Sequence, residues 1–381
     1  MNRHFLRDIA DIQTGPFGSQ LHKEDYVDIG TPIVTVEHLG NRVFTEQNLP
    51  KVSDEDKARL SKYVLKEGDI VFSRVGSVDR CSYVDAAHDG WMFSGRCLRV
   101  RPNTEVDPLY LYYFFCLEDT KQFVRNIAVG ATMPSINTKL LGEVEVAYPS
   151  QTEQQKIVAL LSALDDKIEI NQKINDNLYA QAKAIFAQRF IGIETIPDGW
   201  KKGNLLDIAN YLNGLAMQKF RPRDDEVGLP VLKIKELRQG SCDVSSELCS
   251  PSIKPEYIVH DGDVIFSWSG SLLVDIWCGG TCGLNQHLFK VTSETYDQWF
   301  YYLWTAHHLE RFIAIAADKA TTMGHIKRGE LEKAEVLIPS EKDYKEISSL
   351  MNPLFNLIIA NRIEARKLAE LRDELLPKLM S

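Results

Sequence analysis

The chain repeats itself once over its 381 residues. Residues 131–150 match residues 321–340 at an offset of 190, with the same Thr-Met, Ile, Leu, Glu and Pro-Ser positions. Further upstream, residues 68–73 (GDIVFS) match residues 262–267 (GDVIFS) at an offset of 194. This period is far longer than the roughly 20–50 residues of a solenoid unit. The sequence therefore predicts two copies of one complete fold rather than a stack of small repeats.

Each copy is followed by a long segment with the pattern of a coiled-coil helix. Seam residues recur at alternating spacings of four and three, which is typical of heptads. The first seam comprises Ile157, Leu161, Leu164, Ile168, Asn171, Asn175, Leu178, Ala182 and Ile185, and the second comprises Ile347, Met351, Leu354, Ile358, Asn361, Ala365, Leu368, Arg372 and Leu375. At 1.5 Å per residue, each helix is expected to be roughly 57 Å long.

Two asparagines occupy equivalent seam positions, Asn171 and Asn361. An asparagine buried in a seam costs stability but fixes the register of the two helices. Alternatively, both side chains face solvent where the seam opens. The sequence leaves these two readings open.

The predicted fold class is α/β (α+β). Short apolar strands entered through Gly-Asp turns alternate with loops and apolar helices in both copies. The predicted organisation is two tandem globular domains, residues 1–150 and 192–340, each followed by a long helix, residues 151–191 and 341–381. The order of strands in the sheets does not follow from the sequence.

Composition limits the class of protein. The formal net charge is −9 and the pI is about 5.6, which argues against indiscriminate binding of nucleic acid. Local basic clusters exist nonetheless, the densest lying between residues 219 and 238. No apolar stretch approaches the length that spans a bilayer, and the N-terminal segment lacks the apolar core of a secretory signal. We therefore expect a cytoplasmic protein without a membrane partner.

The seven cysteines do not form a recognisable framework. In the cytosol they are expected to be free thiols. Cys278 and Cys282 have no second Cys or His pair at zinc spacing after them, so no metal site is predicted.

The sequence carries no catalytic signature. It contains no phosphate-binding GxxxxGK[ST] loop, no GxGxxG cofactor loop, no HExxH pair and no GxSxG elbow. The segment Asn352–Phe355 resembles the Asn-Pro-Pro-aromatic motif of amino-methyltransferases, but Leu354 replaces the second proline and lies in the seam. The chain is therefore predicted not to be an enzyme.

The ordered set of motifs resembles the specificity subunit of a Type I restriction–modification system. The resemblance covers essentially the whole chain, and its clearest part is the helix entry at residues 149–158 (PSQTEQQKIV). The other segments that carry it are residues 14–19 (TGPFGS), both Gly-Asp strands, residues 132–137 (TMPSIN) and residues 285–287 (NQH). The second copy departs from the pattern at residues 324–327, where GHIK replaces PSIN.

The resemblance implies a function in DNA recognition. Each globular copy would be a target recognition domain, and the helices would pair as an antiparallel coiled coil that holds the two domains apart. The chain would recognise a bipartite, asymmetric site in double-stranded DNA and direct partners to it: two methyltransferase (M) subunits and the restriction (R) subunits. S-adenosylmethionine, ATP and Mg would be bound by those partners and not by this chain.

Polar side chains in predicted loops near the shared motifs are the expected DNA contacts, because Arg, Lys, Asn and Gln read base edges while Lys, Arg, Ser and Thr hold phosphates. In the first copy they are Gln20, Lys23, Arg74, Ser77, Arg80, Thr132, Ser135 and Asn137. In the second copy they are Lys219, Arg221, Lys233, Lys235, Trp268, Ser269, Asn285, Gln286, His287, Thr322 and Lys327. For Trp268 and His287 a structural role in the domain is the competing interpretation.

Two other functions would each account for part of the sequence. A fused methyltransferase–specificity chain would need a loop that binds S-adenosylmethionine, which the sequence lacks. A coiled-coil scaffold without a role in DNA binding would explain the helices but would leave both globular copies without a function.

Overall fold

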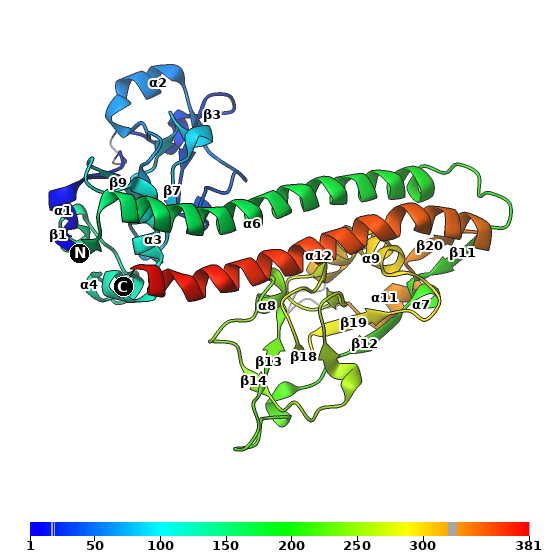
Figure 1. Cartoon of the computed structure of the whole chain (residues 1–381). Coiled ribbons are helices and arrows are strands. Elements are labelled where there is room, and N and C mark those ends of the chain that lie inside the picture. Colours follow the sequence, from blue (N-terminus) through cyan, green and yellow to red (C-terminus); the bar gives the residue numbers. More distant parts are fainter. Residues whose placement is uncertain (17, 19, 319–325, 381) are drawn as a thin grey trace. The chain divides into compact units, whose positions relative to one another are not determined.

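The computed structural model describes residues 1–380 apart from Phe17, Ser19 and residues 319–325. The chain divides into two compact units. The first unit is residues 1–166 together with the residues from 370 onward, and the second unit is residues 167–369. Two long helices, α6 (Gln151–Phe186) and α12 (Glu341–Met380), contribute one part to each unit (Figure 1).

The first unit contains a four-stranded antiparallel sheet in the order β2–β9–β6–β7. Its strands are β2 (Ala10–Thr14), β9 (Cys97–Pro102), β6 (Ile70–Ser73) and β7 (Cys81–Tyr83). All four residues of β6 are buried, since the strand is covered on both faces. Phe72 packs edge-on against Phe115 of helix α3 (Pro108–Cys116), while Val71 belongs to a second core on the other face.

That second core lies under a smaller mixed sheet in the order β3–β5–β4–β8, in which β4 and β8 run parallel. A separate antiparallel pair joins β1 to β10, next to the start of α6. The strands are β3 (Tyr26–Val27), β5 (Lys51–Val52), β4 (Thr31–Val34), β8 (Met92–Phe93), β1 (Asn2–Phe5) and β10 (Glu145–Tyr148), and the remaining α-helices are α1 (Leu6–Ile9), α2 (Asp54–Arg59), α4 (Glu118–Ile127) and α5 (Thr138–Leu141).

The second unit repeats this topology except at the edges of the smaller sheet, where β15 beside β18 is the fourth strand and β3 beside β5 has no counterpart. Its sheets have the orders β12–β19–β16–β17 and β14–β13–β18–β15, with β13 and β18 parallel, and β11 pairs with β20. The strands are β12 (Asn210–Asn213), β19 (Leu288–Thr292), β16 (Val264–Ser267), β17 (Leu273–Ile276), β14 (Leu248–Cys249), β13 (Leu229–Leu232), β18 (Cys282–Leu284), β15 (Ile258–Val259), β11 (Lys201–Asn204) and β20 (Glu335–Ile338). The helices are α7 (Leu205–Ile208), α8 (Ile234–Gln239), α9 (Gln298–His307), α10 (Leu309–Asp318) and α11 (Arg328–Glu332). The predicted duplication of one mixed α and β fold is confirmed.

The Gly-Asp turn before β6 and β16 has the same geometry in both copies. Gly68 and Gly262 adopt φ values of 90° and 96°, a left-handed conformation that glycine enters without steric cost. The aspartate that follows then accepts a hydrogen bond from the backbone N–H three residues before it: Asp69 from Lys66 at 2.8 Å, and Asp263 from His260 at 2.7 Å. The sequence pair Gly-Asp thus encodes the turn that starts each central strand.

The seam predicted from the heptads is observed. Each predicted seam residue of α6 and α12 is buried or half-buried. In the second unit, Asn171 of α6 donates to the Glu364 carboxylate (2.7 Å) and Asn175 donates to the Ile358 carbonyl (3.1 Å). Because the later residue on α6 meets the earlier residue on α12, these parts of the helices pair antiparallel.

The two seam asparagines are buried, with 1% of Asn171 and 8% of Asn361 exposed. The Asn361 amide donates to Asn175 Oδ1 at 2.9 Å. The alternative in which both side chains face solvent is therefore wrong. A shift of the helices by one turn would leave these amides without partners in an apolar seam, which favours the role in fixing register.

Each long helix ends in the core that belongs to the other copy of the repeat. Leu376 and Met380 of α12 are part of the core of the first unit. Phe186, near the end of α6, packs edge-on against Trp304 in the core of the second unit, with ring centroids 5.1 Å apart. Neither globular copy therefore completes its core from its own half of the sequence.

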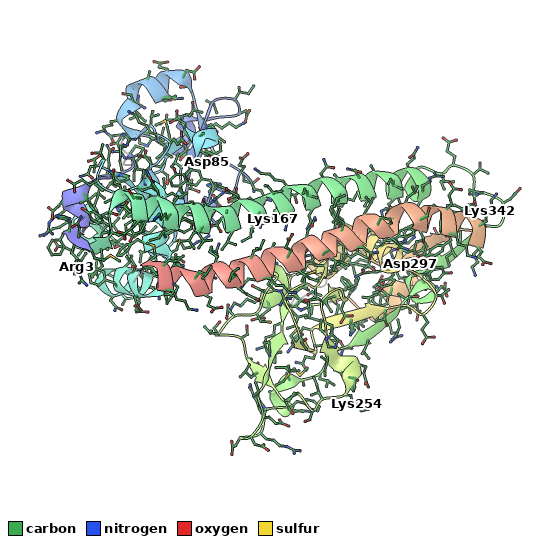
Figure 2. All side chains as sticks on the ribbon, viewed as in Figure 1. Arg3, Asp85, Lys167, Lys254, Asp297 and Lys342 are labelled. Atoms are coloured by element: carbon green, nitrogen blue, oxygen red, sulfur yellow. The ribbon has the colours of Figure 1, made fainter. Side chains whose placement is uncertain are left out.

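Ion pairs and hydrogen bonds hold the helices to the globular parts. In the first unit, Asp165 of α6 is 4% exposed and accepts from Tyr113 Oη (2.7 Å) and from Arg372 of α12 (2.6 Å). In the second unit, Arg362 of α12 makes two hydrogen bonds to Asp275 of β17, at 2.8 and 2.7 Å. Asp297, labelled in Figure 2 at the start of α9, accepts from the Ser348 hydroxyl of α12 at 2.7 Å.

We predict that Leu376→Ala destabilises the first unit by about 2–5 kcal/mol, because it leaves a cavity in a core to which residues 1–166 contribute nearly all other side chains. Hydrogen exchange should show the loss of protection in residues 1–166, although the substitution lies near the other end of the chain. The matched control is Leu371→Ala on the same helix, where the side chain is 43% exposed and the expected effect is small. Equal loss of protection from both variants would contradict the assignment of α12's last turns to this core.

Candidate nucleic-acid interface

In the first copy, two loops that are distant in sequence carry four of the predicted contacts side by side. The loop after β6 contains Arg74 and Ser77, and the loop before α5 contains Thr132 and Ser135. Ile136 donates its backbone N–H to the Arg74 carbonyl at 2.9 Å, and Gly76 donates to the Pro134 carbonyl at 2.8 Å. Thr132 and Ser77 are exposed on this pair of loops. The main chain thus presents polar side chains on one small surface.

Two predicted contacts that follow β6, Arg74 and Arg80, also bind the protein's own backbone. Arg74 donates to the Gly95 carbonyl at 3.1 Å, and Arg80 donates to the Leu39 carbonyl. These bonds orient the guanidinium groups, each of which has five N–H donors.

Three first-copy residues have structural roles or are not described in full. Gln20 accepts from Tyr63 Oη at 2.7 Å, and Asn137 is the N-cap of α5, where it accepts from the Leu140 N–H at 2.9 Å. Lys23 begins a 3₁₀ helix (Lys23–Asp25), and its side chain lies outside the part that the structure describes. A DNA contact by any of the three remains a prediction.

The same main-chain hydrogen bond recurs in the second copy, between the residues equivalent to Ile136 and Arg74. Ile326 donates to the Trp268 carbonyl at 3.1 Å, as Ile136 does to Arg74. Trp268 is half-buried; its indole N–H donates to Asn213 at 2.9 Å and its ring lies 5.8 Å from that of Phe289. These contacts support the structural interpretation of Trp268 over insertion into DNA.

A polar cluster lies beside this tryptophan. His287 Nδ1 lies 3.0 Å from the Ser269 hydroxyl, and His287 Nε2 lies 3.3 Å from the Gln286 amide. The buried Asn285 accepts from the His287 backbone N–H at 3.2 Å. The structure therefore brings Ser269, Asn285, Gln286 and His287 together, as the sequence predicted for a site, but these side chains largely bond one another.

The basic segment 219–238 is partly neutralised. Glu247 pairs with Lys233 at 2.5 Å and with Arg221, and the hydrogen bond from Lys233 is the main reason why the pKa of Glu247 is lowered. Lys235 lies 3.3 Å from Asp243 and 3.0 Å from the Ser245 hydroxyl. Lys219 and Arg223 are exposed in the same segment. Arg223 was not singled out as a contact from the sequence, although it stands in the basic run that would have suggested it.

Two predicted contacts complete the set. Lys327 is exposed and directly precedes α11, and Thr322 lies outside the described residues.

All seven cysteines are free thiols. Over residues 1–380 without the gaps named above, the structure shows no group of three or more His, Cys, Asp or Glu placed to hold a metal ion, and no helix long and apolar enough to cross a membrane.

Comparison with known proteins now identifies the class. A family model described as the type I restriction modification DNA specificity domain matches residues 2–180 and again residues 197–372. The chain therefore belongs to the type I restriction modification DNA specificity family. It is a DNA sequence-specificity component and not a catalytic one.

Named relatives agree over nearly the full length. The chain is 27% identical to the type I restriction enzyme MjaIX specificity subunit of Methanocaldococcus jannaschii, over 98% of this chain and 91% of that protein. It is 23% identical to the type I restriction enzyme EcoKI specificity subunit of Escherichia coli, over 87% of this chain and 76% of that protein. Among solved structures, the S subunit of a type I restriction-modification system from M. genitalium matches with a TM-score of 0.57 at 15% identity, over 99% of this chain and 95% of that one. At that identity the structural match supports the fold alone.

We predict that Lys219→Gln and Arg223→Gln each weaken DNA binding about equally for all sequences. The logarithm of the association constant falls with the logarithm of the salt concentration, and each variant should make this dependence less steep by about 1. The reason is that each phosphate contact releases about one counterion. Fluorescence anisotropy over a salt series measures both effects. Lys345→Gln makes the same change of charge on α12, where Lys345 pairs with the exposed Glu341, and should leave the slope unchanged. A loss confined to one DNA sequence would instead assign these residues to base recognition.

Proposed function

We propose that the globular copies, residues 1–150 and 192–340, are target recognition domains that each read one half of a bipartite, asymmetric site in double-stranded DNA. The helices at residues 151–191 and 341–381 act as a spacer that sets the distance between the halves. In this proposal the chain directs partner methyltransferase and restriction subunits to the site in the cytoplasm. S-adenosylmethionine, ATP and Mg are bound by those partners.

The observation that supports an asymmetric DNA site is that the two globular copies share a backbone arrangement but carry different side chains at equivalent positions. The hydrogen bond from Ile136 to Arg74 recurs between Ile326 and Trp268, so these two pairs of residues occupy equivalent positions. Yet the side chain at the first position is an arginine in one copy and a tryptophan in the other. Arginine reads guanine through two N–H donors, whereas the single N–H of Trp268 donates to Asn213, so the second copy has no equivalent pair of donors at this position. Two such surfaces do not recognise the same half-site.

The test is to express the chain with its neighbouring methyltransferase subunit in a host that lacks methylation, and to map modified bases by single-molecule sequencing. One bipartite, asymmetric motif, modified only when both chains are present, is the expected result. Exchanging residues 192–340 for the domain of another family member should change only one half of that motif. No methylation by a folded, cofactor-loaded partner would contradict the proposal, and binding of S-adenosylmethionine by this chain alone would favour the fused enzyme.

We further propose that the helices supply two equivalent docking surfaces for two methyltransferase subunits. Leu160 on α6 and Leu350 on α12 occupy the same position of the repeat and are 44% and 49% exposed. A leucine that stays exposed on the outer face of a paired helix gains stability when a partner covers it. One such residue at the same place in each copy fits a stoichiometry of two.

We predict that Leu160→Glu and Leu350→Glu each remove one methyltransferase subunit, and that the double variant removes both. Each introduced carboxylate would be desolvated on docking, which is unfavourable. Native mass spectrometry of the co-purified complex counts the subunits. Leu357→Glu, on α12 and 45% exposed, has a lysine at the equivalent position of α6 and serves as the control. Retention of two subunits by the double variant would rule out this pair of surfaces.

A further inference from the structure

A pair of fully exposed apolar side chains stands at equivalent positions of the two copies. Ile29 precedes β4 and Val227 precedes β13, and each is 90% exposed. Both lie in the pattern acid, β-branched residue, Gly, any residue, Pro: Asp28–Pro32 in one copy and Glu226–Pro230 in the other. Single exposed apolar residues are common on protein surfaces. The same exposure at the same place in two copies that otherwise differ calls for a common role.

The backbone around Ile29, at the tip of its loop, is held against the rest of the first copy. A Cβ atom at Gly30 would overlap the Val52 carbonyl of β5, so the backbone next to Ile29 packs directly against that strand. Lys51 of β5 donates to the Asp28 carbonyl at 3.2 Å. These contacts hold the main chain on both sides of a side chain that touches solvent.

The backbone around Val227, at the tip of the equivalent loop, is also held in place, but by different contacts. A Cβ atom at Gly228 would lie 2.8 Å from Pro222 Cγ, too close to be accommodated without a shift. The Glu226 carboxylate accepts from the Arg223 N–H at 3.0 Å and from the Ser250 hydroxyl at 2.7 Å. This carboxylate therefore turns toward its own loop and leaves Val227 as the exposed group.

Ile and Val are stiff at χ1, so a side chain held in this way loses little conformational freedom on binding. The segment that leads to Val227 also contains the exposed cations Lys219 and Arg223, which suit contacts to DNA phosphates. An exposed apolar side chain on a loop with exposed cations fits the apolar group that DNA displays in its major groove, which is the C5-methyl of thymine.

We propose that Ile29 and Val227 each contact the methyl group of a thymine, one in each half of the recognition site. This rests on the proposed function, because it names what a recognition domain touches within its half-site. Each half-site then contains a thymine whose methyl group contributes to specificity.

The test couples protein and DNA changes after the motif has been mapped. The chain is assembled with its methyltransferase subunit, and affinity is measured on duplexes in which each thymine is replaced in turn by deoxyuridine, which lacks only the methyl group. The wild-type complex should lose about fourfold in affinity at one thymine per half-site, the effect of one buried methyl group. Ile29→Ala should bind the normal duplex several-fold more weakly and be insensitive to deoxyuridine in the first-domain half alone. Val227→Ala should show the same for the other half.

Val244→Ala is the matched control, since Val244 is a fully exposed valine on a loop of the second copy without an equivalent at that position of the first. It should keep wild-type affinity and sensitivity. Independent effects of Ala and deoxyuridine, or half-sites without a sensitive thymine, would overturn the proposal. Weaker assembly with the methyltransferase and unchanged DNA affinity would overturn it in favour of a protein contact. A chain that directs no methylation at all would instead contradict the proposed function, so the two failures are distinct.

Discussion

The fold depends on where the two long helices end. Each helix begins directly after its own globular copy and ends in the core that the other copy forms. Phe186 packs among the aromatic residues of the second unit, and Leu376 and Met380 pack in the first. A core that is completed by the other half of the sequence cannot form by itself. The stability of each copy therefore depends on residues that follow the other copy. This exchange explains why the compact units cut through both helices although the sequence repeat does not.

The same exchange makes the helix register important. If α6 and α12 slipped against each other by one turn, apolar residues at both ends would leave their cores. The asparagines in the middle of the seam give the slip an additional cost, because Asn361 would lose Asn175 and Asn171 would lose Glu364. The register is thus determined by apolar packing at the ends and by hydrogen bonds at the centre. For a protein proposed to set a fixed distance on DNA, this combination favours a spacer of one length.

The repeat, the seam and the Gly-Asp turns were predictable from the sequence because each depends on residues close together in the chain. The strand order was not, since the parallel pair of β4 with β8 joins residues nearly sixty apart through the burial of Val71 and its neighbours. The sequence predicted which polar residues lie near the shared motifs, but not the role of each side chain. Asn137 illustrates the reason: an asparagine that can accept from an adenine amino group can equally cap a helix, and the local sequence does not say which. The exposed Ile29 and Val227 were missed because a β-branched residue before a strand is ordinarily expected to be buried.

The way in which the recognition loops are held has a consequence for how specificity changes. The contacts that position the loops in both copies run from backbone to backbone, as between Ile136 and Arg74 and between Ile326 and Trp268. A backbone hydrogen bond does not depend on the side chain that the residue carries. Arginine and tryptophan therefore occupy the same position of the same loop without a change of fold. In such a scaffold the surface side chains are free to vary at little cost in stability. Under the proposed function, each domain would then acquire a new half-site while the helices keep the spacing of the old one.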